Sequence, residues 1–353
     1  MKLLHDVRDS KRPPLLSVVV PCHNVESVVL ETLDSLLIAT QGRPVECLLI
    51  EDGSNDETLA VLRHWITQGP RLGFALWSQP NHGLSVVRNR GAAMARGQWL
   101  AFLDSDDRVT AEGFRALWEV ASATSSDLIL GGAQIIEGTG TRTPDRPFYH
   151  ETVWTQLLKG ASRQTVTAIG APAIFALEPN VNYRWIRRDF YQSAGLEFPE
   201  GLLFEDLPVH FRMLRKARAI DLVAAPYYLY RVHRPGKITE SRDLRRFDAL
   251  KTLELAIEEL RSPDLSQNQG AHAVRSVNRL AWGCGRMIPD AGCLDYFKGL
   301  SVRLSRLPLK WRWQTLTLKS RDRWTLHLLM ALPFPWLLAL ISRIPRLPLR
   351  RRG

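Results

Sequence analysis

Three carboxylates stand close together in the sequence, directly after an apolar run. Residues 99–103 read WLAFL, and Asp104, Asp106 and Asp107 follow. Carboxylates this close repel one another unless a cation or a hydrogen-bond network holds them. Mg²⁺ and Mn²⁺ prefer oxygen ligands, and beside a diphosphate they need only one or two protein carboxylates. We therefore expect Asp106 to bind such a cation and Asp104 to lie near a ribose or sugar. A solvated acidic turn that caps a helix is the alternative.

A second acidic loop has the same position relative to an apolar run. Residues 45–50 read VECLLI, and Glu51, Asp52 and Gly53 come next. The Asp52 carboxylate could accept the imide N–H of a pyrimidine, and a glycine after it permits a tight backbone approach. We expect Asp52 to bind the base of a nucleotide, although the same residues also make a common turn.

The first apolar run, residues 15–20, ends in another polar loop that contains Pro21, His23 and Asn24. His23 could stack on a base or close the wall of the pocket. It is a poor catalytic candidate, because no acid or nucleophile lies near it in the sequence. We expect Pro21, His23 and Asn24 to contact the nucleotide.

A helix start with small residues suits a phosphate group. The sequence NHGLS at residues 81–85 is followed by Arg88. Backbone amides at the amino end of a helix attract anions. Gly83 and Arg88 are therefore expected to contact a diphosphate, and an ordinary position on the helix surface is the alternative for Arg88.

A carboxylate pair, Glu205 and Asp206, begins a segment whose apolar residues have helical spacing. A carboxylate at a helix start is usually a cap. If a nucleotide leaves one face of a sugar, however, a base must take the proton of the hydroxyl that attacks the other face. Asp206 is the candidate base, and Glu205 is the candidate for acceptor binding.

A basic turn lies at residues 230–234, which read YRVHR. Arg231 and His233 could neutralise a departing diphosphate. His233 is also a candidate metal ligand beside Asp106. An exposed basic turn without a ligand is the alternative.

The elements that position these residues alternate along the chain. Apolar runs that end in polar loops are typical of buried parallel strands, and apolar residues at helical spacing lie between them. Strands are expected at residues 15–20, 45–50, 74–77, 99–103 and 128–130, with helices at 28–37, 56–65, 84–95 and 112–121. This alternation predicts an α/β fold with ligands at the carboxyl ends of the strands.

The sequence also predicts how the chain is divided. Residues 131–188 show no clear pattern and are expected to hold a loop that selects the acceptor. The expected parts are an N-terminal extension (1–14), a catalytic domain (15–240) with nucleotide-binding (15–130) and acceptor-binding (131–240) portions, a helical region (241–325) and an apolar, basic tail (326–353).

The net charge of +11 comes from the end of the chain. Residues 298–353 contain 13 Lys and Arg against one acid, Asp322, so the preceding residues sum to about −1. A nucleic-acid binder usually places its cations on folded recognition elements, so no nucleic-acid partner is expected. The apolar run at residues 326–341 and its arginine flank fit an interfacial helix on an anionic membrane surface. A short or re-entrant span and a buried terminal helix are the alternatives.

The cysteines indicate the compartment. Cys22, Cys47, Cys284 and Cys293 have no CxxC spacing, and no signal-peptide pattern precedes them. We expect reduced thiols and no zinc site. The chain is expected in the cytoplasm, on the inner face of the plasma membrane.

Four motifs carry a resemblance to a known family. In order, they are VVVPCHN, IEDGSNDET, NHGLSVVRNRGAAMARGQWLAFLDSDD and FEDLP. Together they resemble the family 2 inverting glycosyltransferases of the GT-A fold, of the type that builds bacterial cell-surface polysaccharides. The resemblance covers residues 16–239 and implies a Rossmann-like mixed sheet flanked by helices, here with a helical C-terminal extension. His23 stands where the family usually has Tyr, and Glu51 where Asp is frequent.

The resemblance implies Mg²⁺- or Mn²⁺-dependent transfer from a nucleotide-sugar donor, with a UDP-sugar favoured, to a hydroxyl of a glycan or lipid-linked acceptor. On the family pattern, Asp52 holds the base, Asp104 the ribose or sugar, Asp106 the metal, and Asp206 is the general base. The sequence lacks the QxxRW motif of the processive synthases, which favours addition of single residues. A noncatalytic nucleotide-sugar binding protein and a nucleotidyltransferase are the alternatives.

Overall fold

One mixed β-sheet organises the computed structural model, which describes residues 1–8, 13–68, 73–138, 146–233, 241–316, 318 and 334–343. Within these residues the sheet has 11 strands in the order β1-β4-β3-β2-β5-β10-β7-β11-β6, with β8 beside β7 and β9 beside β11. Their bounds are Lys2–Asp6 (β1), Leu16–Cys22 (β2), Val45–Asp52 (β3), Phe74–Gln79 (β4), Trp99–Phe102 (β5), Arg108–Val109 (β6), Leu128–Glu137 (β7), Arg146–Pro147 (β8), Arg163–Val166 (β9), Arg184–Arg187 (β10) and Ile220–Val232 (β11).

The strands β4, β3, β2 and β5 form a parallel set, because the pairs β3–β4, β2–β3 and β2–β5 are all parallel. Every residue of β2 and β3 is buried, which explains why both strands are mostly apolar. Because parallel strands end at the same edge of a sheet, the loops after β2, β3 and β5 lie side by side. The predicted α/β fold is confirmed, and so are the strands expected from the apolar runs.

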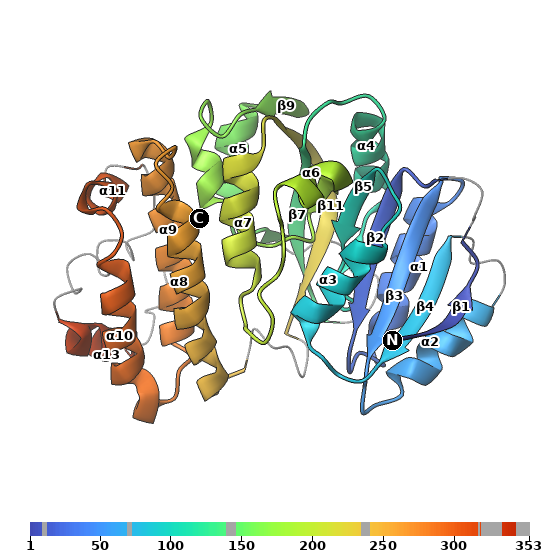
Figure 1. Ribbon diagram of the computed structural model, residues 1–353, viewed down its shortest axis with the longest axis horizontal. Coiled ribbons are helices and arrows are strands. Elements are labelled where there is room, and N and C mark those ends of the chain that lie inside the picture. The colour runs from blue at the N-terminus through green and yellow to red at the C-terminus, as the bar shows by residue number, and fades with distance from the viewer. Residues whose placement is uncertain are drawn as a thin grey trace, which may run out of the picture.

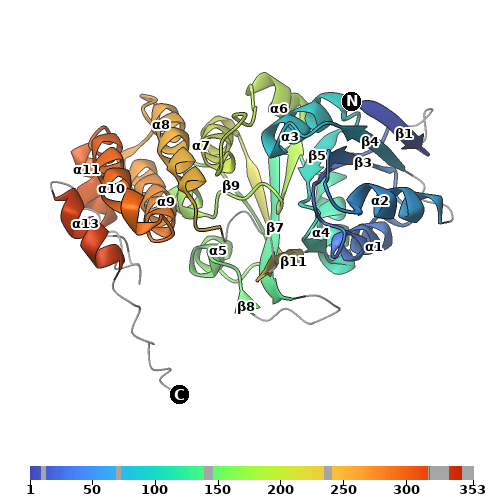
Figure 2. The ribbon, with the colours of Figure 1, turned by 90° about the horizontal axis from the view of Figure 1, so that it is seen from below.

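Helices cover both faces of this sheet. Figures 1 and 2 show α1, α2 and α4 on one face and α3 and α6 on the other. Local sequence defines some of their ends: the side chain of Thr110 caps α4 by accepting from the Gly113 N–H at 2.9 Å. These helices are Val29–Thr40 (α1), Thr58–Thr67 (α2), Leu84–Met94 (α3), Ala111–Ala121 (α4) and Arg188–Ser193 (α6).

The described part of residues 131–188, which shows no clear sequence pattern, contributes strands to the sheet. The strand β10 lies between β5 and β7 and is antiparallel to both, and β11 runs parallel to β7. Two short helices, α5 (Glu151–Leu158) and the 3₁₀ helix η1 (Pro172–Ala176), lie between these strands in the sequence. The segment that leads into β10 therefore lies close to the end of β5.

The C-terminal helices gather at one end of the molecule, opposite β1, β3 and β4 (Figure 1). The helix α13 packs on α10, and α9 packs on η1 and α11. In the described ranges, every helix is too short or too polar to cross a bilayer. The elements are α7 (Asp206–Lys216), η3 (Leu244–Phe247), α8 (Asp248–Leu260), α9 (Gln267–Gly285), α10 (Asp290–Leu304), α11 (Leu309–Thr315) and α13 (Pro335–Ser342).

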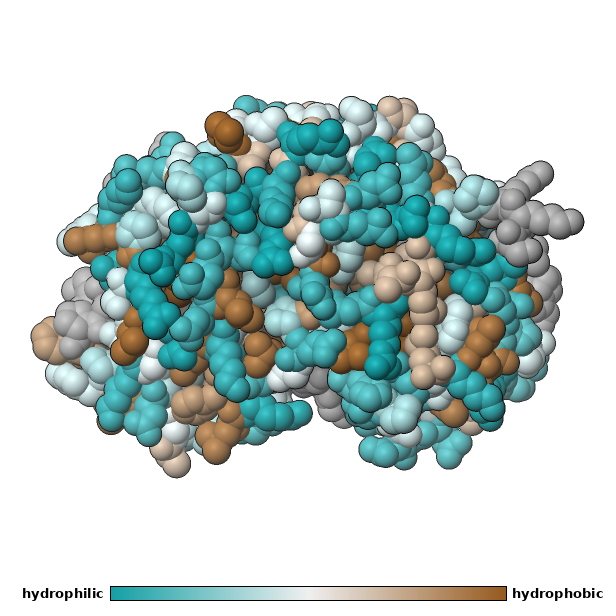
Figure 3. Space-filling view, viewed as in Figure 1, coloured by the Kyte–Doolittle hydropathy of each residue, from teal (hydrophilic) through white to brown (hydrophobic). Residues whose placement is uncertain are grey.

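All four cysteines are buried as free thiols. Burial raises the pKa of the Cys22 and Cys284 thiols to about 12. The surface in Figure 3 is mostly hydrophilic, with scattered hydrophobic residues. Most of the expected membrane tail (326–353), namely residues 326–333 and 344–353, lies outside the described residues.

Candidate functional site

Arg88 is the centre of a buried charge cluster. Its side chain comes from α3 and is 2% exposed. Its Nη2 lies 2.7 Å from Asp104 Oδ1, and its Nη1 lies 2.6 Å from Glu205 Oε1 and 2.9 Å from Asp206 Oδ1. Asp104 follows β5, whereas Glu205 and Asp206 begin α7. The structure thus brings together four predicted site residues, and the interpretation of Arg88 as an ordinary surface residue is wrong.

The carboxylates at the start of α7 face the cluster rather than capping the helix. Glu205 is the N-cap residue, but its side chain makes no capping hydrogen bond. Asp206 Oδ2 accepts from the backbone N–H of Val181 at 3.3 Å. The side chains of Glu205 and Asp206 are 10% and 17% exposed. A partly open carboxylate that does not serve the helix is available for proton transfer.

Asn182 belongs to the site, although no pattern in the sequence marks it. Its Nδ2 donates to Asp104 Oδ2 at 2.8 Å and lies 3.3 Å from the Tyr228 hydroxyl. The residue is fully buried just before β10. Its partners come from two other strands, so no local spacing in the sequence could identify it.

The cluster holds one cation against three carboxylates, and the pKa values of Arg88, Glu205 and Asp206 are shifted. Burial raises the pKa of Glu205 to about 7; Arg88 opposes this shift, and the Asp206 carboxylate adds to it. Burial also raises the pKa of Asp206, again against Arg88. Burial alone would lower the pKa of Arg88, but the three carboxylates raise it. The cluster therefore favours binding a proton near neutral pH.

The variant Glu205→Gln should flatten the dependence of stability on pH. The raised pKa of Glu205 means that the folded state holds this proton up to about 7, whereas the usual value is 4.5. In that window the folded state binds more protons than the unfolded state, so raising the pH lowers the free energy of unfolding. Urea unfolding at several pH values should show a smaller loss in the variant than in the wild type.

The wild type alone does not isolate the effect of Glu205, because two buried histidines change the free energy of unfolding with pH in the opposite direction. Burial lowers the pKa of His150 and of His210 well below the usual value, so these groups favour folding as the pH rises. Both histidines are present in Glu205→Gln as well, so their contributions cancel when the stability of the variant is subtracted from that of the wild type at each pH. Parallel stability curves for variant and wild type would contradict the predicted proton on Glu205.

Asp52 organises the loop that precedes α3. Its Oδ1 accepts from Gln79 Nε2 at 2.8 Å and from the His82 N–H at 3.0 Å, and its Oδ2 accepts from the Gly83 N–H at 2.8 Å. The Asp52 side chain therefore bonds to amides that the sequence assigned to a diphosphate. Its role toward a base, and that of Gly83 toward phosphate, stay predictions.

Gly53→Ala should destabilise the protein more than Gly42→Ala. Both glycines have positive φ, 62° and 74°, where a Cβ costs about 1–2 kcal/mol. A Cβ at Gly53 would also lie 2.5 Å from the Asn81 backbone nitrogen, whereas at Gly42 it meets nothing within 4 Å. Chemical unfolding of the two variants measures the difference. An equal loss in the free energy of unfolding of both variants would mean that the backbone around Asn81 moves to accommodate the new Cβ without loss of stability.

The residues after β2 form the wall of the same loop cluster. His23 Nδ1 lies 2.8 Å from the Asp52 carbonyl oxygen, and its Nε2 lies 3.1 Å from the side-chain amides of Asn24 and Asn81. Asn24 is exposed and has a φ of 51°. Pro21 is buried inside β2. The structure thus brings His23 and Asn24 next to the Asp52 loop, as a shared nucleotide site requires.

The acidic loop after β5 does not cap α4, because Thr110 does. Asp107 is fully buried; its Oδ2 accepts from the Tyr228 hydroxyl, and its Oδ1 accepts from the Arg231 N–H at 2.7 Å. Asp106 is 8% exposed. Asp107 therefore fixes the loop, whereas the ligand roles expected for Asp104 and Asp106 stay predictions.

Arg231 is buried and bonded to protein groups. Its Nε donates to the Asp106 carbonyl oxygen at 2.7 Å, its Nη1 donates to the Gly138 carbonyl, and its Nη2 lies 2.9 Å from Glu31 Oε2. In this structure Arg231 joins β11 and α1 to the loop after β5. Contact between its guanidinium and a diphosphate stays a prediction.

His233 is an exposed residue just beyond β11, with a φ of 57°. Among the described residues, no three His, Cys, Asp or Glu side chains are grouped as a metal site. The predicted metal ligands Asp106 and His233 therefore stay predictions. The rest of the basic loop, residues 234–240, lies outside the described residues.

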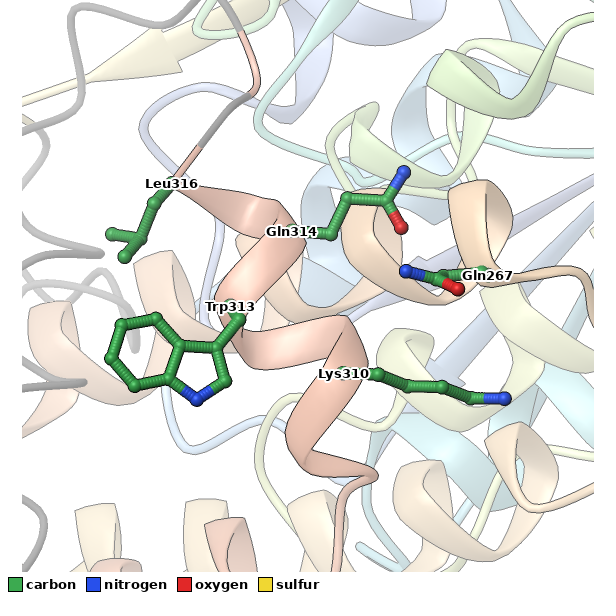
Figure 4. Close-up of a pocket in the computed structure, with 5 residues that line it drawn as sticks. All are labelled: Gln267, Lys310, Trp313, Gln314 and Leu316. Atoms are coloured by element: carbon green, nitrogen blue, oxygen red, sulfur yellow. The ribbon is translucent and has the colours of Figure 1, made fainter.

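A separate hollow of about 560 Å³ lies at the C-terminal helices. Figure 4 shows Gln314 facing Gln267, while Trp313 and Leu316 project to the other side of α11. With Lys310 they line the hollow. Its described lining includes no carboxylate, so the chemistry is assigned to the Arg88 cluster instead.

Comparison with known proteins places this site in a family. The family model described as Glycosyl transferase family 2 matches residues 17–183. The uncharacterized glycosyltransferase EpsJ of Bacillus subtilis is 29% identical over 229 residues, which are 64% of this chain and 63% of EpsJ. The chain thus spans less than two thirds of that relative.

Solved structures share the fold. The structure of S. aureus TarS 1–349 in complex with UDP-GlcNAc has a TM-score of 0.70 and 20% identity, covering 93% of this chain and 88% of that one. The mannosyltransferase PcManGT of Pyrobaculum calidifontis, in complex with GDP-Man and Mn²⁺, has a TM-score of 0.53 and 15% identity, covering 92% of this chain and 89% of that one.

The fold and the matched motifs agree. The residues matched by the family model include β2 to β5, the Asp104 loop and Asn182, and the remaining carboxylates of the cluster begin α7. The mixed sheet with its C-terminal helices is the architecture of the TarS structure. Residues 17–183 therefore form a glycosyltransferase family 2 domain, and the chain has the GT-A fold of the TarS structure.

Proposed function

We propose that this chain transfers a sugar, with inversion, from a nucleotide-diphospho-sugar to a hydroxyl of a glycan or lipid-linked acceptor. The product would belong to a cell-surface polysaccharide. The observation that carries the proposal is the Arg88 cluster, which holds Asp104 of the donor side and Asp206 of the acceptor side on one guanidinium. A displacement at the anomeric carbon needs donor and base at such a junction.

The proposed donor site lies along the carboxyl ends of the parallel strands. Asp52, His23 and Asn24 surround the base, and Asp104 faces the ribose or sugar. A UDP-sugar is the favoured donor, because TarS was solved in complex with UDP-GlcNAc and shares this fold. The Asp104 side chain is 28% exposed, which leaves part of the carboxylate open to a ligand.

The proposed cation is Mg²⁺ or Mn²⁺, held by Asp106 with His233 as a further ligand. The residues fit a hard cation, because the loop after β5 supplies carboxylate oxygens and the diphosphate would supply the rest. Mn²⁺ is present in the complex of PcManGT, which has this fold. When bound, such a cation offsets the negative charge of the departing nucleotide diphosphate.

The proposed base is Asp206, and Glu205 contacts the acceptor. Asp206 would take the proton of the acceptor hydroxyl as that oxygen attacks the anomeric carbon. Its side chain is 17% exposed and already accepts from the Val181 N–H, which fixes its orientation. One base and one displacement invert the anomeric configuration.

The proposed activity is tested with purified protein, Mn²⁺ and a panel of UDP-, GDP- and dTDP-sugars, with membrane-lipid extract as acceptor. Metal-dependent release of the nucleoside diphosphate, and a product of inverted configuration by NMR, are expected with one donor. Release of a sugar 1-phosphate, as the nucleoside monophosphate moves to another acceptor, would instead indicate a nucleotidyltransferase. Nucleotide binding without any release would indicate a binding protein.

We also propose that the C-terminal end rests on an anionic membrane surface, at the cytoplasmic face. In α13, Trp336 and Leu340 are 58% and 61% exposed, although the helix packs on α10. An apolar side chain beside cations suits the interface of an anionic bilayer. This placement would bring the domain close to a lipid-linked acceptor.

The double variant Trp336→Ser, Leu340→Ser should bind anionic vesicles at least about tenfold more weakly than the wild type, because each apolar side chain loses its transfer energy. Co-sedimentation with phosphatidylserine vesicles measures this loss. Ile169→Ser is the matched control, since Ile169 is 78% exposed but lies outside the C-terminal helices. Equal binding by wild type and double variant would remove α13 from the proposed membrane contact.

A further inference from the structure

The carboxylates of Asp104 and Asp206 are each held from two sides. In both residues Oδ1 pairs with Arg88, on Nη2 at 2.7 Å for Asp104 and on Nη1 at 2.9 Å for Asp206. In both, Oδ2 accepts from the segment before β10: from Asn182 Nδ2 at 2.8 Å and from the Val181 N–H at 3.3 Å. The two carboxylates thus lie in a bracket formed by Arg88 and residues 181–182.

The bracket itself is anchored. Arg88 lies 5.2 Å from the centre of the Phe198 ring, and the next residue, Asn89, exchanges two hydrogen bonds of 2.9 Å with the Phe198 backbone. The helix α3 is therefore fixed to the segment that leads into α7. Asn182 also reaches Tyr228, whose hydroxyl donates to Asp107. These contacts leave little freedom to change the spacing between Asp104 and Asp206.

We propose that Arg88 is a positioning residue that sets the distance between the donor-side Asp104 and the base Asp206 and keeps Asp206 ionised while the acceptor binds. The proposal rests on the proposed function and assigns Arg88 to the base rather than to the diphosphate. Both Nη atoms are occupied by carboxylates, and the side chain is 2% exposed. A guanidinium presents such a fork of donors, which an ammonium lacks.

The charges around Asp206 define what removal of Arg88 would do. The charged groups that face it are Arg88 from α3, Asp104 after β5, Arg184 of β10 and its neighbour Glu205. Without Arg88, burial and the other carboxylates favour the protonated base, whereas the Val181 N–H and Arg184 favour the ionised form. A protonated Asp206 cannot accept the proton of the acceptor hydroxyl.

The test compares Arg88→Gln, Arg88→Lys and the wild type at saturating donor and metal. In Arg88→Gln the acidic limb of the kcat profile should move to higher pH by about one to three units, because an ion pair at this distance has that effect. The affinity for the nucleoside diphosphate alone should stay close to that of the wild type. Arg88→Lys should restore most of the pH profile but not the full kcat, because it keeps the charge without the fork.

A double variant guards against loss of folding. Above about pH 7, where Glu205 has lost its proton, Arg88→Gln with Glu205→Gln has the same cluster charge as the wild type, because one positive and one negative charge are both removed. It should fold but keep a low kcat, since Asp206 has lost its bracket. Loss of nucleotide affinity with an unshifted pH profile in Arg88→Gln would overturn the proposal and make Arg88 a donor ligand. Full kcat in the double variant would overturn it as well.

Failure of the proposed transferase activity can be distinguished from failure of the role proposed for Arg88. If the wild type transfers no sugar from any donor, the proposed function fails. The bracket is still tested by urea unfolding against pH, where Arg88→Gln should extend the loss of stability to higher pH than in the wild type. An unchanged stability profile would then contradict the role of Arg88 in keeping Asp206 ionised.

Discussion

Replacing Asp206 by asparagine is expected to lower kcat by about 10²- to 10⁴-fold, the range in which a positioned general base contributes. Asparagine has the same shape and can still accept from the Val181 N–H, which reaches Asp206 Oδ2 at 3.3 Å. It cannot accept the proton of the acceptor hydroxyl. The affinity for nucleotide should therefore change little, and kcat and kcat/KM for the acceptor should fall together. Steady-state kinetics and calorimetric binding of the nucleotide measure both.

Asp264→Asn is the matched control for this variant. Asp264 is a carboxylate that also pairs with an arginine, Arg215, but its side chain is 57% exposed and Arg215 lies at the opposite end of α7 from Asp206. It should retain wild-type kcat. If Asp206→Asn retained full activity, the base would have to be Glu205. In that case Glu205→Gln, expected to raise the acceptor KM, would instead abolish kcat.

Replacing Asp106 by asparagine is expected to remove the metal-dependent part of the reaction, with a loss of kcat of about 10²- to 10³-fold. A neutral amide is a much weaker ligand for Mg²⁺ or Mn²⁺ than a carboxylate. Nucleoside diphosphate release should fall and should respond only weakly to added Mn²⁺. The release assay over a range of Mn²⁺ concentrations measures both effects.

Asp107→Asn distinguishes loss of a ligand from damage to the loop. Asp107 is fully buried and accepts from the Tyr228 hydroxyl and the Arg231 N–H, so its variant should lower the melting temperature. Asp106→Asn should melt close to the wild type. A wild-type response to Mn²⁺ in Asp106→Asn would assign the metal to other groups.

The sequence predicted the N-terminal half of the sheet well, because local patterns determine it. The strands β2, β3 and β5 are short, mostly apolar runs that end in acidic or polar loops, and parallel packing leads those loops to one edge. Asp104 could be selected because it follows such a run, and Asp206 because it begins a segment with helical spacing. That both would meet on Arg88 did not follow from the pattern.

The residues that sequence reasoning missed are those whose partners are distant. Asn182 and Val181 act through hydrogen bonds to Asp104 and Asp206, and no spacing marks them. Arg231 was expected to face a ligand, but its guanidinium pairs with Glu31 of α1. A charged side chain looks the same in a sequence whether water, a ligand or a buried partner satisfies it.

The buried cysteines can be used to measure local unfolding of the protein. Cys22 and Cys47 lie in β2 and β3, whereas Cys284 and Cys293 lie in α9 and α10, and all four are shielded from solvent. Alkylating reagents attack thiolates that they can reach, and burial suppresses both conditions. Native protein should therefore be alkylated slowly, at rates set by local unfolding. Mass spectrometry of the modified peptides would then time the opening of the sheet and of the C-terminal helices independently.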